Sequence, residues 1–111
     1  MQINFEKDGR ILIVNMTGEL DHHSAENVRY KIDNNIDNMG YPNVIFNFAG
    51  INFMDSSGIG VIIGRYRKVS EYGGKVGIIN MKADLRRIFE LGGIFKIIKE
   101  YKSYDDAVSN F

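Results

Sequence analysis

Short apolar segments alternate along this chain with longer segments in which apolar residues recur every three or four positions. The short segments are typical of β-strands, and the longer spacing is typical of amphipathic helices. An Asp8-Gly9 turn predicts a β-hairpin over residues 3–16, with Thr17 and Gly18 ending its second strand. After the hairpin, helices and strands alternate, which requires crossover connections. The expected fold class is therefore α/β, built on a mixed sheet with parallel members.

The helices can be placed from their apolar faces. Val28, Ile32 and Ile36 lie four residues apart and mark the first helix, with Asp21 or Ser24 as its N-terminal cap. A second helix is expected from about residue 57 to residue 72, and a third over 82–91. The third helix should turn four apolar side chains inward: Leu85, Ile88, Phe89 and Leu91.

Three further strands and a last helix complete the prediction. The first of these strands covers residues 43–48 and should end near Phe48. Another covers 75–80, and a short one is expected around 96–98, before a terminal helical segment within 103–110. No linker or repeat divides the chain, so residues 1–111 are expected to form one domain.

Composition narrows the function classes. The 111 residues contain 14 basic and 14 acidic side chains, so the net charge is zero and no nucleic-acid partner is expected. There is no cysteine, and the only histidines, His22 and His23, are sequence neighbours that point apart. We therefore expect no metal and no cofactor. No apolar run spans a bilayer and no signal peptide opens the chain, which predicts a cytoplasmic protein without a membrane partner.

The segment Asp55-Ser56-Ser57-Gly58 stands where a strand gives way to the second helix. One interpretation is structural, because Asp and Ser side chains commonly accept hydrogen bonds from the first free amides of a helix. The other is functional, with one serine serving as a modification site or as a nucleophile. The two glycines that follow, Gly58 and Gly60, would keep the helix thin enough for a partner to approach.

The same segment does not match the sequence motifs of common enzyme active sites. No glycine stands two residues before either serine, so the nucleophile-elbow pattern is absent, and no Walker A motif follows. A small serine hydrolase would have to use His22 or His23 as its base. We therefore expect a protein that is not an enzyme.

Two motifs carry a family resemblance. "TGELDHHSAE" at residues 17–26 and "FMDSSGIGVIIGRYR" at 53–67 resemble the anti-sigma-factor antagonist branch of the STAS-domain family, including its sporulation members. The likeness continues through "YGGKV" and "LRRIFELGGIFKII", and so covers nearly the whole chain. It implies a single STAS domain, with a mixed sheet and helices packed mainly on one side.

The resemblance also implies a function by partner switching. Unphosphorylated, such a protein binds an anti-sigma factor that is also a serine kinase, and thereby frees a sigma factor. The kinase phosphorylates the serine that follows the aspartate, here Ser56 with Ser57 as the weaker candidate, and a serine phosphatase reverses the step. The implied partner-binding residues come from two loops: Leu20, Asp21 and His22, and Asp55, Ser56, Ser57, Gly58, Ile59 and Gly60.

The physical chemistry of phosphate agrees with such a switch. A phosphoserine adds about −1.5 to −2 charges at neutral pH, and a helix N-terminus tolerates that charge. A partner surface fitted to a small neutral serine would meet both added bulk and a charge that must be desolvated. We expect Asp21 to contact the partner electrostatically, and Asp55 either to cap the helix or to position the hydroxyl. Another STAS phospho-switch or a stress-signalling scaffold remains the alternative.

Overall fold

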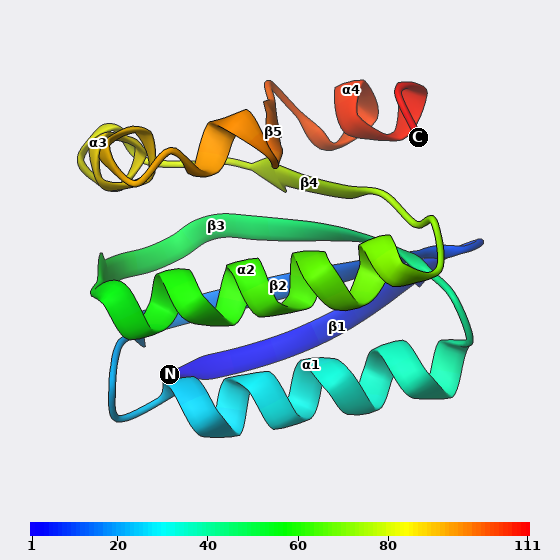
Figure 1. The fold of residues 1–111 in the computed structure, drawn as a ribbon, viewed down its shortest axis with the longest axis horizontal. Helices are drawn as coiled ribbons and strands as arrows, with labels where there is room; N and C mark the ends of the chain where they lie inside the picture. Colours follow the sequence, from blue (N-terminus) through cyan, green and yellow to red (C-terminus); the bar gives the residue numbers. More distant parts are fainter.

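The structure is a computed structural model that describes residues 1–111. Its five strands form a single sheet in which the spatial order follows the chain order, β1-β2-β3-β4-β5 (Figure 1). β1 (Gln2–Asp8) pairs antiparallel with β2 (Ile11–Leu20), which confirms the predicted hairpin. β3 (Asn43–Met54), β4 (Val76–Ile79) and β5 (Lys99–Tyr101) follow as parallel neighbours. The sheet is therefore mixed, as the alternation of elements predicts.

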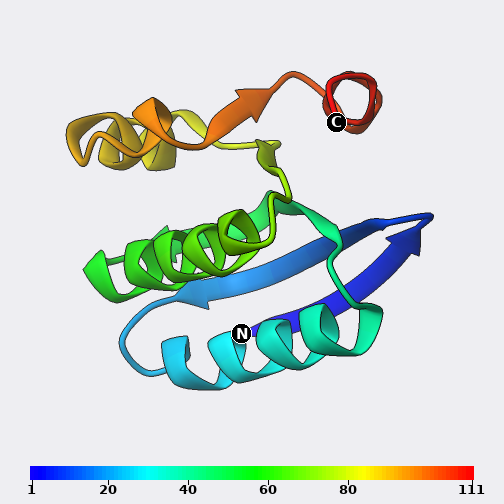
Figure 2. The same cartoon turned by 45° about the vertical axis from the view of Figure 1, so that its right-hand side comes forward.

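Helices cover the two faces of this sheet unequally. α1 (Ala25–Met39), α2 (Ser56–Glu71) and α3 (Ala83–Leu91) contribute to one large core, whereas α4 (Tyr104–Ser109) packs on the opposite face. Figures 1 and 2 both show α1 and α2 running side by side. Three of the four helices thus lie on one face, as the resemblance to the STAS family implies.

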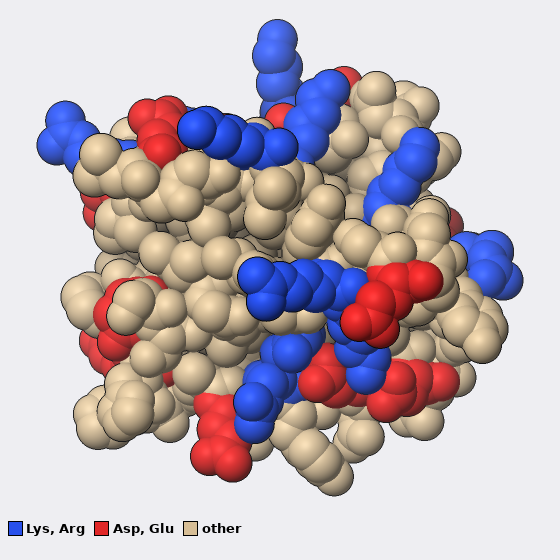
Figure 3. All heavy atoms as spheres, viewed as in Figure 1, with Lys and Arg blue, Asp and Glu red and all other residues tan.

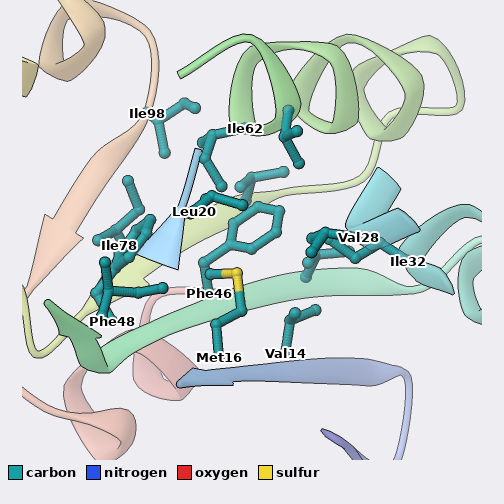
Figure 4. Close-up of a cluster of buried hydrophobic side chains, with 14 of the residues drawn as sticks. Val14, Met16, Leu20, Val28, Ile32, Phe46, Phe48, Ile62, Ile78 and Ile98 are labelled. Carbon is teal, nitrogen blue, oxygen red and sulfur yellow. The ribbon is translucent and has the colours of Figure 1, made fainter. Parts of the chain in front are cut away.

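The central strands are apolar on both faces because both faces are covered. Along β2, Leu12 and Val14 enter the large core, and Ile11 and Ile13 enter the smaller cluster beneath α4. Figure 4 shows the large core where the strands meet the helices, and its fully buried side chains include Val28, Ile32, Phe46, Phe48 and Ile62. The predicted inward face of α1 is thus confirmed.

β2 and β3 both extend beyond their predicted ends. We expected β2 to stop at Thr17-Gly18 and β3 near Phe48, but they continue to Leu20 and Met54 and remain paired. Register shifts follow Asn15 and Gly18, and Gly18 has a φ of 112°, so this glycine accommodates an irregularity in the ladder rather than a turn. The extension brings the ends of β2 and β3 together at the edge where α1 and α2 begin.

The segment after α3 also differs from prediction. The short strand is β5 at residues 99–101 rather than 96–98, because a 3-10 turn, η1 (Ile94–Lys96), follows Gly93, whose φ is 71°. Leu91 was expected to point inward but is 84% exposed. It lies six residues after Leu85, about 240° further round the helix, and so leaves the buried stripe that contains Phe89.

Candidate functional site

Asp55 caps α2. Its Oδ1 accepts hydrogen bonds from the backbone N–H groups of Ser57, at 2.9 Å, and Gly58, at 3.3 Å. Of the roles proposed for this segment, capping therefore belongs to the aspartate and not to either serine. A cap of this kind contributes about 1 kcal/mol to stability.

The same carboxylate also joins the two loops of the predicted site. Asp55 Oδ2 accepts a hydrogen bond from the backbone N–H of His22 at 3.1 Å. The loop after β2 is thereby held against the first turn of α2. The structure thus brings together the two sequence motifs, which lie some thirty residues apart in the chain.

The loop before α1 has its own internal bonds. Asp21 Oδ1 accepts from the N–H groups of His23, at 2.9 Å, and Ser24, at 3.1 Å. Ser24 Oγ accepts from the N–H of Asp21 and donates to the carbonyl of Glu19, but it makes no capping bond to α1. Asp21 is therefore the side chain that orders this turn.

These contacts affect the charge of Asp21. Desolvation opposes ionisation of its carboxyl, but the N–H groups of Ser24 and His23 and the nearby imidazole of His23 outweigh that effect and lower the pKa. Asp21 therefore presents a negative charge at the edge of the site at neutral pH.

The two serines differ in accessibility. Ser56, the first residue of α2, is exposed, whereas Ser57 is half-buried. Neither hydroxyl forms a hydrogen bond within the chain, and the capping bonds of α2 are made by Asp55. The Ser56 hydroxyl is thus free and reachable from solvent at the first residue of α2.

Two residues predicted to contact a partner lie inside the molecule. Leu20 is fully buried, and Gly58 is buried against it: a Cβ added to Gly58 would lie 2.4 Å from the carbonyl oxygen of Leu20. Gly58 is therefore required for α2 to approach the end of β2, and not for the approach of another protein. Of the other predicted residues, His22, Ser56 and Gly60 are exposed, and Asp21, Asp55, Ser57 and Ile59 are half-buried.

The histidines do not form a catalytic or metal-binding arrangement with these residues. Both are exposed, and their rings meet edge to face with centroids 5.7 Å apart, so the prediction that these neighbours point apart is wrong. His22 contacts Asp55 through its backbone rather than its ring. No three His, Asp or Glu side chains converge as ligands for a metal ion. None of the helices is both long enough and apolar enough to cross a membrane.

The sequence profile of the STAS domain family matches residues 2–107. The chain belongs to the STAS domain family. Among its STAS relatives, the anti-sigma F factor antagonist of Paenibacillus polymyxa is 34% identical over 109 residues, which cover 98% of this chain and 93% of that protein. The family predicted from the two motifs is thus confirmed.

Solved STAS structures extend the comparison. The anti-sigma factor antagonist SpoIIAA in its unphosphorylated form is 29% identical, with a TM-score of 0.75, and 98% of this chain and 96% of that chain are covered. The Bacillus cell fate determinant SpoIIAA in its phosphorylated form is also 29% identical, with a TM-score of 0.76 and 98% of both chains covered. This STAS domain therefore resembles both forms of that relative equally closely.

One feature of the site was not predicted from sequence. Gly64 and Arg65 line a groove between α1 and α2 together with His22 and Ser57. The sequence does contain a signal for it, because Gly64 follows Gly60 by four residues and both therefore lie on one face of the helix. The position of α1 beside that face depends on tertiary packing.

Proposed function

We propose that this STAS domain is an anti-sigma factor antagonist. Its unphosphorylated form binds an anti-sigma factor that has serine-kinase activity and so releases a sigma factor, and phosphorylation of Ser56 ends the binding. The observation that carries the proposal is the free, exposed hydroxyl of Ser56 beside the Asp55–His22 contact. The similarity to the anti-sigma F factor antagonist of Paenibacillus polymyxa and to the unphosphorylated and phosphorylated forms of SpoIIAA supports it.

The geometry accounts for a switch that leaves the fold intact. The N–H groups of Ser57 and Gly58 already bind Asp55, so a phosphate on Ser56 would project outward from the helix start. There it would add about −1.5 to −2 charges beside the carboxylates of Asp55 and Asp21. A partner that buries this surface would have to desolvate that charge without a matching cation, which disfavours the complex.

The surface that we propose for partner binding consists of the predicted residues that remain accessible to solvent. Asp21 and His22 come from the loop before α1, and Ile59 and Gly60 from the first turn of α2, on either side of Ser56. Leu20 and Gly58 support this surface from below. In this proposal a serine phosphatase restores the binding form, and the cycle takes place in the cytoplasm.

The decisive experiment incubates the protein with its cognate anti-sigma kinase and ATP and locates the phosphate by mass spectrometry. Phosphate is expected on Ser56, and Ser56→Ala should abolish it while Ser57→Ala should not. Binding of the unphosphorylated protein to the anti-sigma factor is then measured by calorimetry. Ser56→Ala should bind, and Ser56→Asp should bind at least about tenfold more weakly. Full affinity of Ser56→Asp would contradict the proposal.

A further inference from the structure

Asparagine side chains form a hydrogen-bonded row across the sheet: Asn4 in β1, Asn15 in β2, Asn47 in β3 and Asn80 directly after β4. Asn80 Nδ2 donates to Asn47 Oδ1 at 2.9 Å, and Asn47 Nδ2 donates to Asn15 Oδ1 at 2.8 Å. Asn15 Nδ2 in turn donates to Asn4 Oδ1 at 3.0 Å. Asparagine is depleted in β-strands, so a continuous row of this kind indicates a specific role.

The row lies on the sheet face that α4 covers in part. Side chains alternate along a strand, so Asn15 and Asn47 point to the same side as Ile13 and Ile45, which pack beneath α4. α1 and α2 cover the opposite face, and Figure 3 shows basic and acidic side chains mixed over these two helices. The row itself contains no charged group, and its bonds join neighbouring strands to one another.

Asn47 also holds a β-bulge. The pairing of β2 with β3 shifts between Asn15 and Thr17, where β3 has one residue more than β2. Ala49 lies in this part of β3, and its backbone N–H donates to Asn47 Oδ1 at 3.0 Å. The same oxygen accepts the amide of Asn80. One side chain therefore fixes the bulge and ties it to the strands on both sides.

The backbone of Asn80 supports this arrangement. Its φ is 60°, in the left-handed region that few residues other than glycine adopt, and asparagine is among those that tolerate it best. In this conformation, directly after the last residue of β4, its side chain reaches Asn47 in β3.

The register shifts decide which residues of β3 reach the switch site. Beyond Phe48, the buried residues Ile51 and Met54 follow at intervals of three positions instead of two, because each shift adds one residue to β3. Met54 thereby pairs with Leu20, and Asp55 follows where it accepts the bond that joins the two loops. Loss of the first shift would move this end of β3 by one residue and separate Asp55 from the loop after β2.

We propose that Asn47 is a positioning residue for the phosphorylation switch. By holding the first bulge, it keeps Asp55 in contact with His22 and so orders the surroundings of Ser56 before a partner binds. It acts through the register of β3 and not by contact with Ser56. The inference rests on the proposed function, because it concerns affinity for the anti-sigma kinase. When only a fraction of the molecules holds the binding-competent arrangement, apparent affinity falls by that fraction.

The structural step is tested by amide hydrogen exchange on the free protein. Asn47→Ala should accelerate exchange at Ala49 and His22 by at least about threefold, because the Asp55 contact is then populated for less of the time. Asn47→Asp retains the acceptor oxygens and should restore slow exchange. Asn4→Ala, at the outer end of the row and away from the bulge, is the matched control and should leave His22 unchanged.

The functional step is tested by phosphorylation with the cognate anti-sigma kinase and ATP. Asn47→Ala should raise KM about fivefold and leave kcat unchanged, because binding of the kinase reorders the loops. Asn47→Asp and Asn4→Ala should keep the wild-type KM. Asn80→Gly keeps the positive φ but removes the bond to Asn47, and should show both effects of Asn47→Ala to a smaller extent.

A lower Tm of Asn47→Ala with unchanged KM would reduce Asn47 to a stabilising residue and overturn the inference. A higher KM with unchanged exchange at His22 would also overturn it, because the effect would not pass through the Asp55 contact. If Asn47→Ala does not fold, Asn80→Gly decides by the same two measurements. Failure of the wild-type protein to be phosphorylated or bound would instead remove the proposed function, whereas the exchange experiment would still test the link between Asn47 and His22.

Discussion

The backbone N–H of His22 donates a 3.1 Å hydrogen bond to Oδ2 of Asp55, a residue 33 positions later in the chain. The other oxygen of the same carboxylate caps α2. One side chain thus holds the loop before α1 and the start of α2 in a fixed relation. The free hydroxyl of Ser56 lies next to this contact, so its surroundings are ordered before any partner binds.

Replacing Asp55 should loosen both elements at once. Asp55→Ala removes the acceptor for three N–H groups, and we expect a loss of about 1–2 kcal/mol in the free energy of unfolding, measured by urea denaturation. Hydrogen exchange should accelerate at the amides of His22 and Ser57. Asp55→Asn retains one acceptor oxygen and should lose less. An unchanged exchange rate at His22 would show that this bond does not hold the loop.

The glycines of α2 should respond in opposite directions to alanine. Gly58→Ala would place a methyl group 2.4 Å from the carbonyl oxygen of Leu20, and we expect a loss of about 1–3 kcal/mol in thermal or urea unfolding. Gly60→Ala meets no atom within 4 Å and should stabilise the protein by about 0.5–1 kcal/mol. Equal effects at the two positions would contradict the packing described for Gly58.

Two apolar residues of α3, one buried and one exposed, allow the contribution of core packing to stability to be tested. Phe89 is fully buried, with its ring 5.6 Å from that of Phe48, so Phe89→Ala should cost about 3–5 kcal/mol of unfolding free energy. Leu91 is 84% exposed, and Leu91→Ala should change that free energy by no more than about 0.5 kcal/mol. A large loss of unfolding free energy in Leu91→Ala would show that Leu91 points into the core, as the sequence pattern predicted.

Stability should fall at alkaline pH through Tyr104. The hydrogen bond from its hydroxyl to Asp8, together with partial desolvation, raises the pKa of Tyr104 from 10.0 to about 12. A raised pKa means that the folded state holds the proton more tightly than the unfolded state. The stabilisation is therefore complete below pH 10 and is lost as the pH rises from 10 towards 12.

Thermal unfolding of the wild type and of Tyr104→Phe between pH 9 and pH 12 measures this contribution. The wild type should lose more stability than the variant over that interval, so that their difference in Tm shrinks with rising pH. Because other groups titrate equally in both proteins, the comparison isolates Tyr104. Parallel curves would show that the bond to Asp8 does not survive in solution.

The order of elements could be predicted from sequence because local patterns determine it. Val28, Ile32 and Ile36 recur with the period of a helix, and Asp8-Gly9 favours a hairpin turn whatever surrounds it. The site motifs were also recognisable, because Asp55 and Ser56 stand together in a short, specific segment. These features depend on residues close to one another in the chain.

Where a local signal had two meanings, only the tertiary structure decided between them. In sequence, Gly18 predicts the end of a strand, but β2 pairs with β3 beyond this residue and continues to Leu20. Gly58 and Gly60 look alike in sequence, yet one packs against Leu20 and the other faces open space. Burial and pairing are set by residues far away in the chain, so the periodicity of a single segment contains no information about them.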